Sequence, residues 1–181
     1  MRYGLQVTSG SHRIFGEKMR LAKSFIEVDT DAREPAATTI KAYMPVGSMS
    51  GSGSIDVTAF EALIPSKELV FHGVRFEVNS GEEYSTPGVA TVSIENAEKL
   101  LSSIDHLAAV KITTDRFALS EIEAVVEELR IVVFNTQQGR LHAAVEAGGT
   151  TCHLMRQSDL FDLGKLVSLA IAHLRDKGAK V

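Results

Sequence analysis

The fold of this chain is decided by LRIVVFNTQQGRLHAAVEAGGTTCHLM, residues Leu129–Met155, followed shortly by SDLFDLGKLVSLAIAHLRDKG, residues Ser158–Gly178. The first stretch contains three strand-like runs separated by two glycine-bearing turns. In the second stretch apolar residues recur at three- and four-residue intervals, with Ser158 placed as the N-cap and Gly178 as the stop. The sequence therefore predicts three antiparallel strands closed by an amphipathic helix.

The second turn of this stretch sets the register of its last two strands. Gly148 and Gly149 both tolerate a positive φ, which a two-residue hairpin turn requires. Placed at the centre of the turn, they pair Val145 with Cys152 and put both side chains on the buried face. The outward face is then predicted to hold His142, Ala144, Glu146, Thr151 and His153.

Upstream segments repeat this combination of strands and a helix. Residues 69–78 and 88–94 alternate like strands, and residues 95–110 carry one apolar helical stripe. We therefore predict an α+β fold: a mostly antiparallel sheet of about five to seven strands, with two amphipathic helices on one face and the C-terminal helix closing the fold. The stripe of that last helix is predicted to pack on the strand containing Leu141, Ala143 and Val145.

The N-terminal part of the chain divides by composition. Residues 1–44 are predicted to be either an N-terminal extension or part of the core. Residues 45–54 contain three glycines and four serines, which is typical of a loop or linker. Residues 55–181 form the predicted α+β core domain, which begins with a short helix that must end near Pro65.

The overall composition excludes several classes of protein. A hydrophobic fraction of 44% with 23% charged residues is ordinary for a globular protein, and a net charge of −4 makes nucleic acid an improbable partner. No apolar run approaches the roughly 20 residues that span a bilayer, and the start of the chain lacks the apolar run of a secretory signal. We therefore expect a cytoplasmic protein without membrane association, unless a leader has been removed.

Side chains that could bind a metal or transfer protons are predicted to lie together in one place. None of the six histidines has the close spacing of a metal site. The predicted register, however, places His142, Glu146 and His153 on one face, where they could bind a ligand or metal or act as acid and base. An ordinary polar outer face explains the same pattern and is favoured. The single cysteine, Cys152, is predicted to be a core residue. The sequence thus predicts no catalytic residue, no resident metal and no cofactor.

An exposed sheet face favours an interaction protein. If Asn135 pairs with Arg140 across the first turn, Ile131 and Val133 join Ala144 on the outward face as an aliphatic patch. The sequence therefore favours a non-catalytic interaction or scaffold domain that forms a homodimer through this patch, with another protein as a further candidate partner. The alternative is a sensor domain that binds a small ligand in a pocket between sheet and helix. A metal-dependent or hydrolytic enzyme is the third interpretation.

Overall fold

The computed structural model of the chain divides into two units. Unit 1 contains residues 1–31 and 71–181, and unit 2 contains residues 32–70. The structure describes residues 2–8, 11–16, 24–33, 38–46, 56–64, 69–112, 120–136 and 139–181. The sequence left open whether residues 1–44 are an extension or part of the core, and residues 1–31 group with the C-terminal part of the chain. Most of the predicted linker, residues 47–54, lies outside the described residues.

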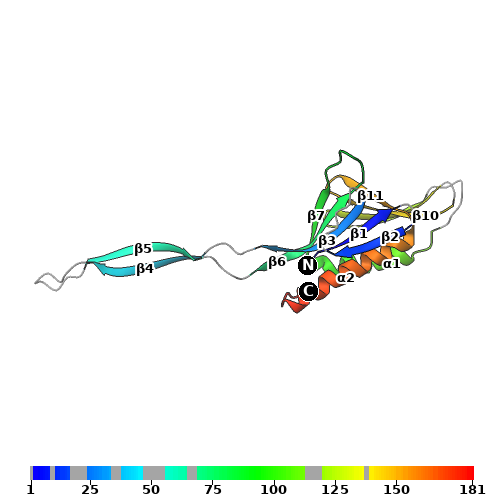
Figure 1. Ribbon diagram of the computed structural model, residues 1–181. Helices are drawn as coiled ribbons and strands as arrows, with labels where there is room; N and C mark the ends of the chain where they lie inside the picture. The colour runs from blue at the N-terminus through cyan, green and yellow to red at the C-terminus, as the bar shows by residue number, and fades with distance from the viewer. Residues whose placement is uncertain are drawn as a thin grey trace, which may run out of the picture. The chain divides into compact units, whose positions relative to one another are not determined.

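Two antiparallel sheets form the β part of unit 1 (Figure 1). One has the strand order β2-β1-β3-β6-β7 and the other the order β11-β10-β9-β8. The first sheet consists of β1 (Arg2–Thr8), β2 (Ser11–Gly16), β3 (Phe25–Arg33), β6 (Val70–Asn79) and β7 (Gly88–Ser93). The second consists of β8 (Glu121–Val126), β9 (Leu129–Asn135), β10 (Leu141–Ala147) and β11 (Thr150–Leu154). Since β7 also contacts β9 and β10, the two sheets meet along this strand.

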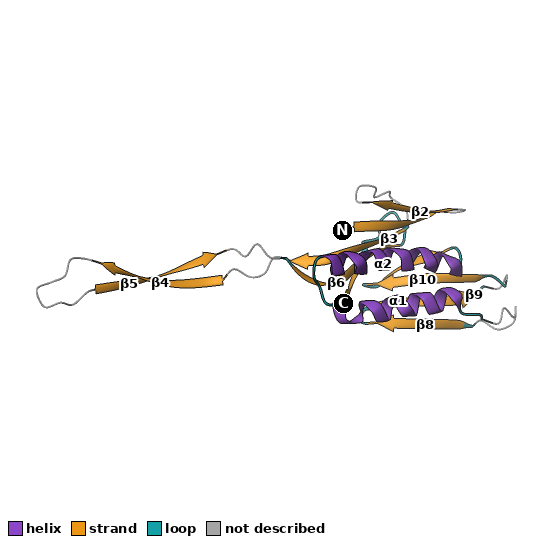
Figure 2. Cartoon of the chain, turned by 90° about the horizontal axis from the view of Figure 1, so that it is seen from below, coloured by secondary structure: helices purple, strands orange, loops and turns teal. Residues whose placement is uncertain are grey.

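Two helices form a layer against these strands. They are α1 (Ile94–Ala109) and α2 (Leu160–Asp176), and a 3₁₀ turn, η1 (Gln157–Asp159), precedes α2. The helices are antiparallel neighbours, because Gly164 approaches Ile104 while Arg175 forms an ion pair with Glu98. Figures 1 and 2 show them side by side, with the strands of unit 1 on one side only. No helix in the described part of the chain is long and apolar enough to cross a membrane.

The sheets and helices of unit 1 share one hydrophobic core. Its members alternate along the strands and follow one stripe of each helix. The first sheet contributes Leu5, Ile26 and Phe76, all fully buried. Leu129 and Leu154 are fully buried members from the second sheet. Strands β1 and β3 are therefore part of the core of unit 1.

The predicted α+β class and closing C-terminal helix are confirmed, but the strand arrangement differs. The described residues hold eleven strands in three sheets, where the sequence predicts one sheet of about five to seven strands. Asp56–Ile64 is strand β5 and not a helix, because it pairs along its length with β4. Ser158 is also not the N-cap of the last helix. Asp159 occupies that position without a side-chain hydrogen bond to α2; its Oδ2 instead accepts a hydrogen bond from Arg156 N at 2.8 Å, which caps η1.

Unit 2 contains a two-stranded antiparallel ribbon. Its strands are β4 (Thr38–Val46) and β5 (Asp56–Ile64). Ile40 and Phe60 lie on the same face by register, and each is 44% exposed. On the other face Lys41 and Glu61 form an exposed ion pair at 2.9 Å, which contributes at most about 1 kcal/mol. Large apolar side chains of the ribbon thus remain partly open to solvent.

The Gly148-Gly149 hairpin has the predicted register. Both glycines have positive φ, 55° and 79°, and Val145 pairs with Cys152. Side chains on one face of a strand recur at every second residue. The outward face of the second sheet therefore carries the predicted set: His142, Ala144, Glu146, Thr151 and His153.

The predicted register of the preceding turn is wrong by one residue. Asn135 pairs with Leu141 and not with Arg140. Instead, Thr136 N donates a hydrogen bond to Arg140 O at 2.9 Å, and Gly139 adopts a φ of 71°. Five residues therefore separate Asn135 from its partner, where the prediction assumed four.

This shift corrects the predicted aliphatic patch. A slip of one residue exchanges the two faces of a strand. Ile131 and Val133 are consequently core residues, with 1% and 0% of their surface exposed. Val132 and Phe134 lie instead beside Ala144 on the outward face.

The stripe of α2 is buried as predicted, but its main neighbours differ. Leu160, Leu163, Val167, Ile171 and Leu174 are all buried in the core. They lie on the side of α2 that packs mainly against α1 and β1. The sequence predicts instead that the stripe packs on the strand with Leu141, Ala143 and Val145. It does not show that β1 lies closer to the helix.

We predict that Leu163→Ala lowers the free energy of unfolding by about 2–5 kcal/mol, because Leu163 is fully buried and its truncation leaves a cavity. Guanidinium melts at low protein concentration measure this change. Leu169→Ala on the outer side of the same helix is the matched control and should cost less than about 0.5 kcal/mol. Equal losses from the two substitutions would contradict the assigned faces of α2.

Candidate functional site

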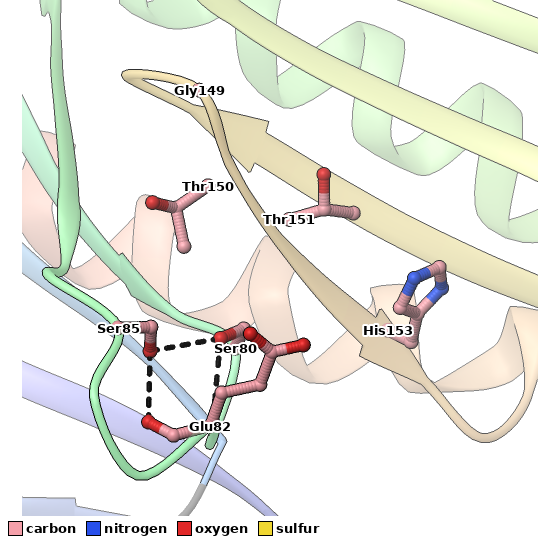
Figure 3. A pocket seen from close by; sticks show the side chains of 7 residues that line it. All are labelled: Ser80, Glu82, Ser85, Gly149, Thr150, Thr151 and His153. Carbon is pink, nitrogen blue, oxygen red and sulfur yellow. Dashed lines mark hydrogen bonds between the residues drawn. The ribbon is translucent and has the colours of Figure 1, made fainter.

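A polar groove lies between the β6–β7 loop and the β10–β11 hairpin of unit 1 (Figure 3). Its volume is about 340 Å³, near the lower end of the range for small-ligand sites. Hydroxyl groups dominate its walls, together with one carboxylate and one imidazole. The lining residues are Ser80, Glu82, Ser85, Gly149, Thr150, Thr151 and His153.

The loop wall of the groove is held by its own hydrogen bonds. Ser80 Oγ donates to Ser85 Oγ at 2.9 Å, and Ser85 Oγ donates to the carbonyl oxygen of Glu82 at 3.0 Å. Glu82 N donates to Ser80 Oγ at 3.4 Å, and Ser24 Oγ donates to the carbonyl oxygen of Ser80 at 2.7 Å. These bonds use the backbone of Glu82, and Figure 3 shows its side chain rising from the loop into the groove.

The hairpin wall is fixed against β7 by a contact that requires glycine. A Cβ on Gly88 would lie 1.7 Å from the carbonyl oxygen of Ala147, a distance that no side chain can occupy. Beside this contact, Thr150 Oγ1 donates to the carbonyl oxygen of Thr86 at 3.1 Å. The turn of the second sheet is thereby anchored to the loop that enters β7 in the first sheet.

The register brings the predicted residues His142, Glu146 and His153 to one face, but each has another neighbour there. The ring centroid of Phe134 lies 5.9 Å from that of His142 and 6.3 Å from that of His153. Glu146 Oε2 lies 3.7 Å from Arg130 Nη1. Among the described residues, no group of three His, Cys, Asp or Glu side chains could hold a metal ion. His153 contributes instead to the polar groove.

Arg130 organises the charges of this outward face. Its guanidinium contacts Glu121 at 3.2 Å and Glu146 at 3.7 Å, and it also donates a hydrogen bond to Glu123. The hydrogen bond to Glu123 raises the pKa of Arg130 above its ordinary value, so the group remains a cation at any pH of interest. Glu146 is thus part of an exposed ion-pair network.

The nucleophilic side chains near the groove have structural roles. A serine activated for catalysis gives its proton to a nearby base. Ser80 and Ser85 donate theirs to oxygen atoms of the loop instead. Cys152 is fully buried, as predicted, and burial raises the pKa of its thiol to about 12. The described groove therefore suits binding better than nucleophilic chemistry.

A second, apolar groove lies between α1 and α2. Its volume is about 600 Å³, and its lining residues are Asp105, Phe161, Gly164, Lys165, Ser168 and Leu169. Phe161 and Leu169 are 48% and 44% exposed and stand roughly two turns apart on α2. Gly164 lies between them and has no side chain to fill the space. Both side chains lie outside the buried stripe of the helix.

The chain matches no protein-family model, no curated protein and no solved structure. Its function is therefore inferred from its own residues, above all from these two grooves.

The sequence alone did not identify most of the groove residues. It assigns residues 79–83 to a turn by composition, and no local signal shows that this turn meets the β10–β11 hairpin. The hydrogen bond between Thr150 and Thr86 joins residues that are 64 positions apart. Phe161 and Leu169 could have been identified, because they are large apolar residues that fall outside the predicted stripe of the last helix.

We predict that Gly88→Ala destabilises unit 1 by about 3 kcal/mol or more, since the added carbon would collide with the backbone of Ala147. Thermal and denaturant unfolding measure the loss. Gly149→Ala is the comparison: its Cβ would meet no atom within 4 Å, so only its φ of 79° is unfavourable. That substitution should cost about 1–2 kcal/mol. A smaller loss at Gly88 than at Gly149 would contradict the close contact.

We predict that native Cys152 reacts with iodoacetamide at pH 8 at least about 100-fold more slowly than the same residue in the unfolded chain. The reason is that burial raises the thiol pKa to about 12 and blocks access to the sulfur atom. Mass spectrometry of timed samples with and without guanidinium measures both rates. Similar rates would show that the β10–β11 hairpin opens readily.

Proposed function

We propose that this protein is a non-catalytic interaction domain that forms a homodimer through the outer side of α1 and α2. The observation that carries the proposal is the apolar groove bordered by the half-exposed side chains of Phe161 and Leu169. The core of unit 1 lies on the opposite side of the helices, so these side chains contribute little to the fold of a single copy. Two large apolar side chains gathered around one groove favour contact with a partner more than the same side chains scattered singly would.

Charge favours a second copy of the chain as that partner. Asp105 of α1 and Lys165 of α2 both line the groove. In a two-fold symmetric contact whose axis runs along the groove, each side of the groove faces the opposite side of the other copy. Asp105 of one copy would therefore meet Lys165 of the other, twice in the interface. Lys165 also pairs with Asp162 at 3.2 Å, but an exposed pair within one helix is weak enough to rearrange.

The outward face of the second sheet is a weaker candidate for the interface. Ile131 and Val133 belong to the core, and Ala144 is itself only 2% exposed. The ion pairs of Arg130 with Glu121, Glu123 and Glu146 lie on the same face. The dimer is therefore assigned to the helices and no longer to this face.

A ligand-binding sensor is the second candidate function. It is supported by the polar groove at Ser80 and His153, which lies between a loop and a hairpin and not between sheet and helix as first expected. Metal-dependent or hydrolytic activity has the least support. A cytoplasmic location and a further protein partner stay predictions.

We predict that the protein sediments as a dimer at micromolar concentration and that Phe161→Glu or Leu169→Glu raises the dimer dissociation constant at least about tenfold. Each substitution places a charge in the apolar contact, whereas the buried side of α2 is unchanged. Sedimentation velocity over a concentration series measures the constant, and circular dichroism confirms that each variant is folded.

The controls separate the helix surface from general effects of charge. Tyr84→Glu adds the same charge at a side chain that is 94% exposed and outside the groove, so it should leave the dimer intact. Asp105→Lys should weaken association, and Lys165→Asp in the same chain should restore it. A monomer at high micromolar concentration, or a dimer that tolerates both glutamates on α2, would refute the proposal.

A further inference from the structure

We propose that the polar groove between the β6–β7 loop and the β10–β11 hairpin binds a small ligand through a primary ammonium group. This inference deepens the second candidate function by naming the ligand class of its groove, and it does not rest on the homodimer because the groove involves neither α1 nor α2. It rests on the hydrogen-bond acceptors of the groove walls that the fold itself does not use.

The hydroxyl groups of the groove present acceptors. A serine or threonine hydroxyl has one proton to donate and two lone pairs that accept. Ser80 gives its proton to Ser85, Ser85 gives its own to the carbonyl oxygen of Glu82, and Thr150 gives its own to the carbonyl oxygen of Thr86. Three of the four lining hydroxyls have therefore committed their protons within the protein, and a ligand there meets lone pairs.

Glu82 adds a negative charge to this acceptor surface. Its carboxylate accepts hydrogen bonds and cannot donate when ionised. The hydrogen bonds that shape the loop at this position use the backbone nitrogen and oxygen, so the side chain is not required to hold the loop. Figure 3 shows the carboxylate within the groove, on the side toward His153. A cation with several N–H donors satisfies both the charge and the lone pairs.

The geometry favours an ammonium over a guanidinium. The acceptors come from two separate segments, the loop at Ser80–Ser85 and the strand that begins at Thr150. An ammonium directs three donors to different sides of one point charge, whereas a guanidinium presents a planar fork that suits one coplanar acceptor pair. A volume of about 340 Å³ also leaves room for the alkyl chain that carries the ammonium.

Two sources could supply such a group: a free small amine, or the side chain of a lysine presented by a polypeptide. Both offer an alkylammonium of similar length. The test therefore uses n-butylammonium as the probe and Nα-acetyl-lysine-N-methylamide as a blocked lysine. Tighter binding of the blocked lysine assigns the groove to a polypeptide, and tighter binding of the simple amine assigns it to a free ligand.

The experiment is a titration of the ¹⁵N-labelled full chain at physiological salt, followed by amide chemical shifts. We expect saturable shifts at Glu82, Gly149, Thr150 and Thr151 with n-butylammonium. n-Butanol and butyrate, which match its length but are neutral and anionic, should bind at least about tenfold more weakly. Glu82→Gln should weaken n-butylammonium binding by at least the same factor while leaving the remaining amide shifts in place.

The matched control is Glu83→Gln, which removes the same charge from the neighbouring, exposed residue of the same loop that does not line the groove. It should keep the affinity within about twofold, because screening at physiological salt limits the effect of charges outside the contact. Phe161→Glu should likewise retain amine binding even where the dimer is lost. The inference is overturned if no saturable shift occurs at the groove, if butanol binds equally well, or if the two glutamine variants behave alike.

Discussion

The arrangement of unit 1 depends on the close approach of Gly88 in β7 to the carbonyl oxygen of Ala147. This is the place where the edge strand of the first sheet meets the turn of the second. Any side chain at position 88 would push the two sheets apart. Because the β6–β7 loop leads directly into Gly88, the same contact brings the loop beside the hairpin and creates the polar groove. The groove is thus a consequence of how the sheets join.

The helix pair gives the molecule a second surface with different chemistry. One side of α2 supplies Leu163 and Val167 to the core, and burial of such side chains stabilises the fold by about 1.5–3 kcal/mol each. The other side carries Phe161 and Leu169 around Gly164. The close approach of Gly164 to α1 serves the packing of the two helices and also leaves the groove open. A two-stranded ribbon such as β4–β5 is marginal in water by itself. Its partly exposed Ile40 and Phe60 offer apolar surface that a binding partner could cover.

Local patterns predicted the C-terminal part of this fold well, and long-range pairing explains where they failed. The Gly148-Gly149 turn dictated its own register, since two adjacent glycines fit few other turns. The turn before it was misjudged by one residue because its sequence does not show that Gly139 takes the left-handed position. That single error moved Ile131 and Val133 to the wrong face. Strand β5 was mistaken for a helix because its apolar residues fit either period until the partner strand β4 is known. His153 faces outward as predicted. The sequence did not show its neighbours in the groove, because they come from a loop distant in sequence.

Each candidate site contains at least one side chain that the fold itself does not need. The core accounts for the inner stripe of α2, yet it gives no reason for a phenylalanine and a leucine on the outer side. The loop hydrogen bonds account for Ser80 and Ser85 and for the backbone of Glu82, yet they leave its carboxylate without a structural task there. Exposed apolar side chains favour aggregation, and a carboxylate beside several hydroxyl lone pairs increases local repulsion. Neither feature improves the stability of a single copy, and each becomes favourable when a complementary surface or cation is bound. The functional sites of this protein are therefore inferred from the side chains that its fold does not require.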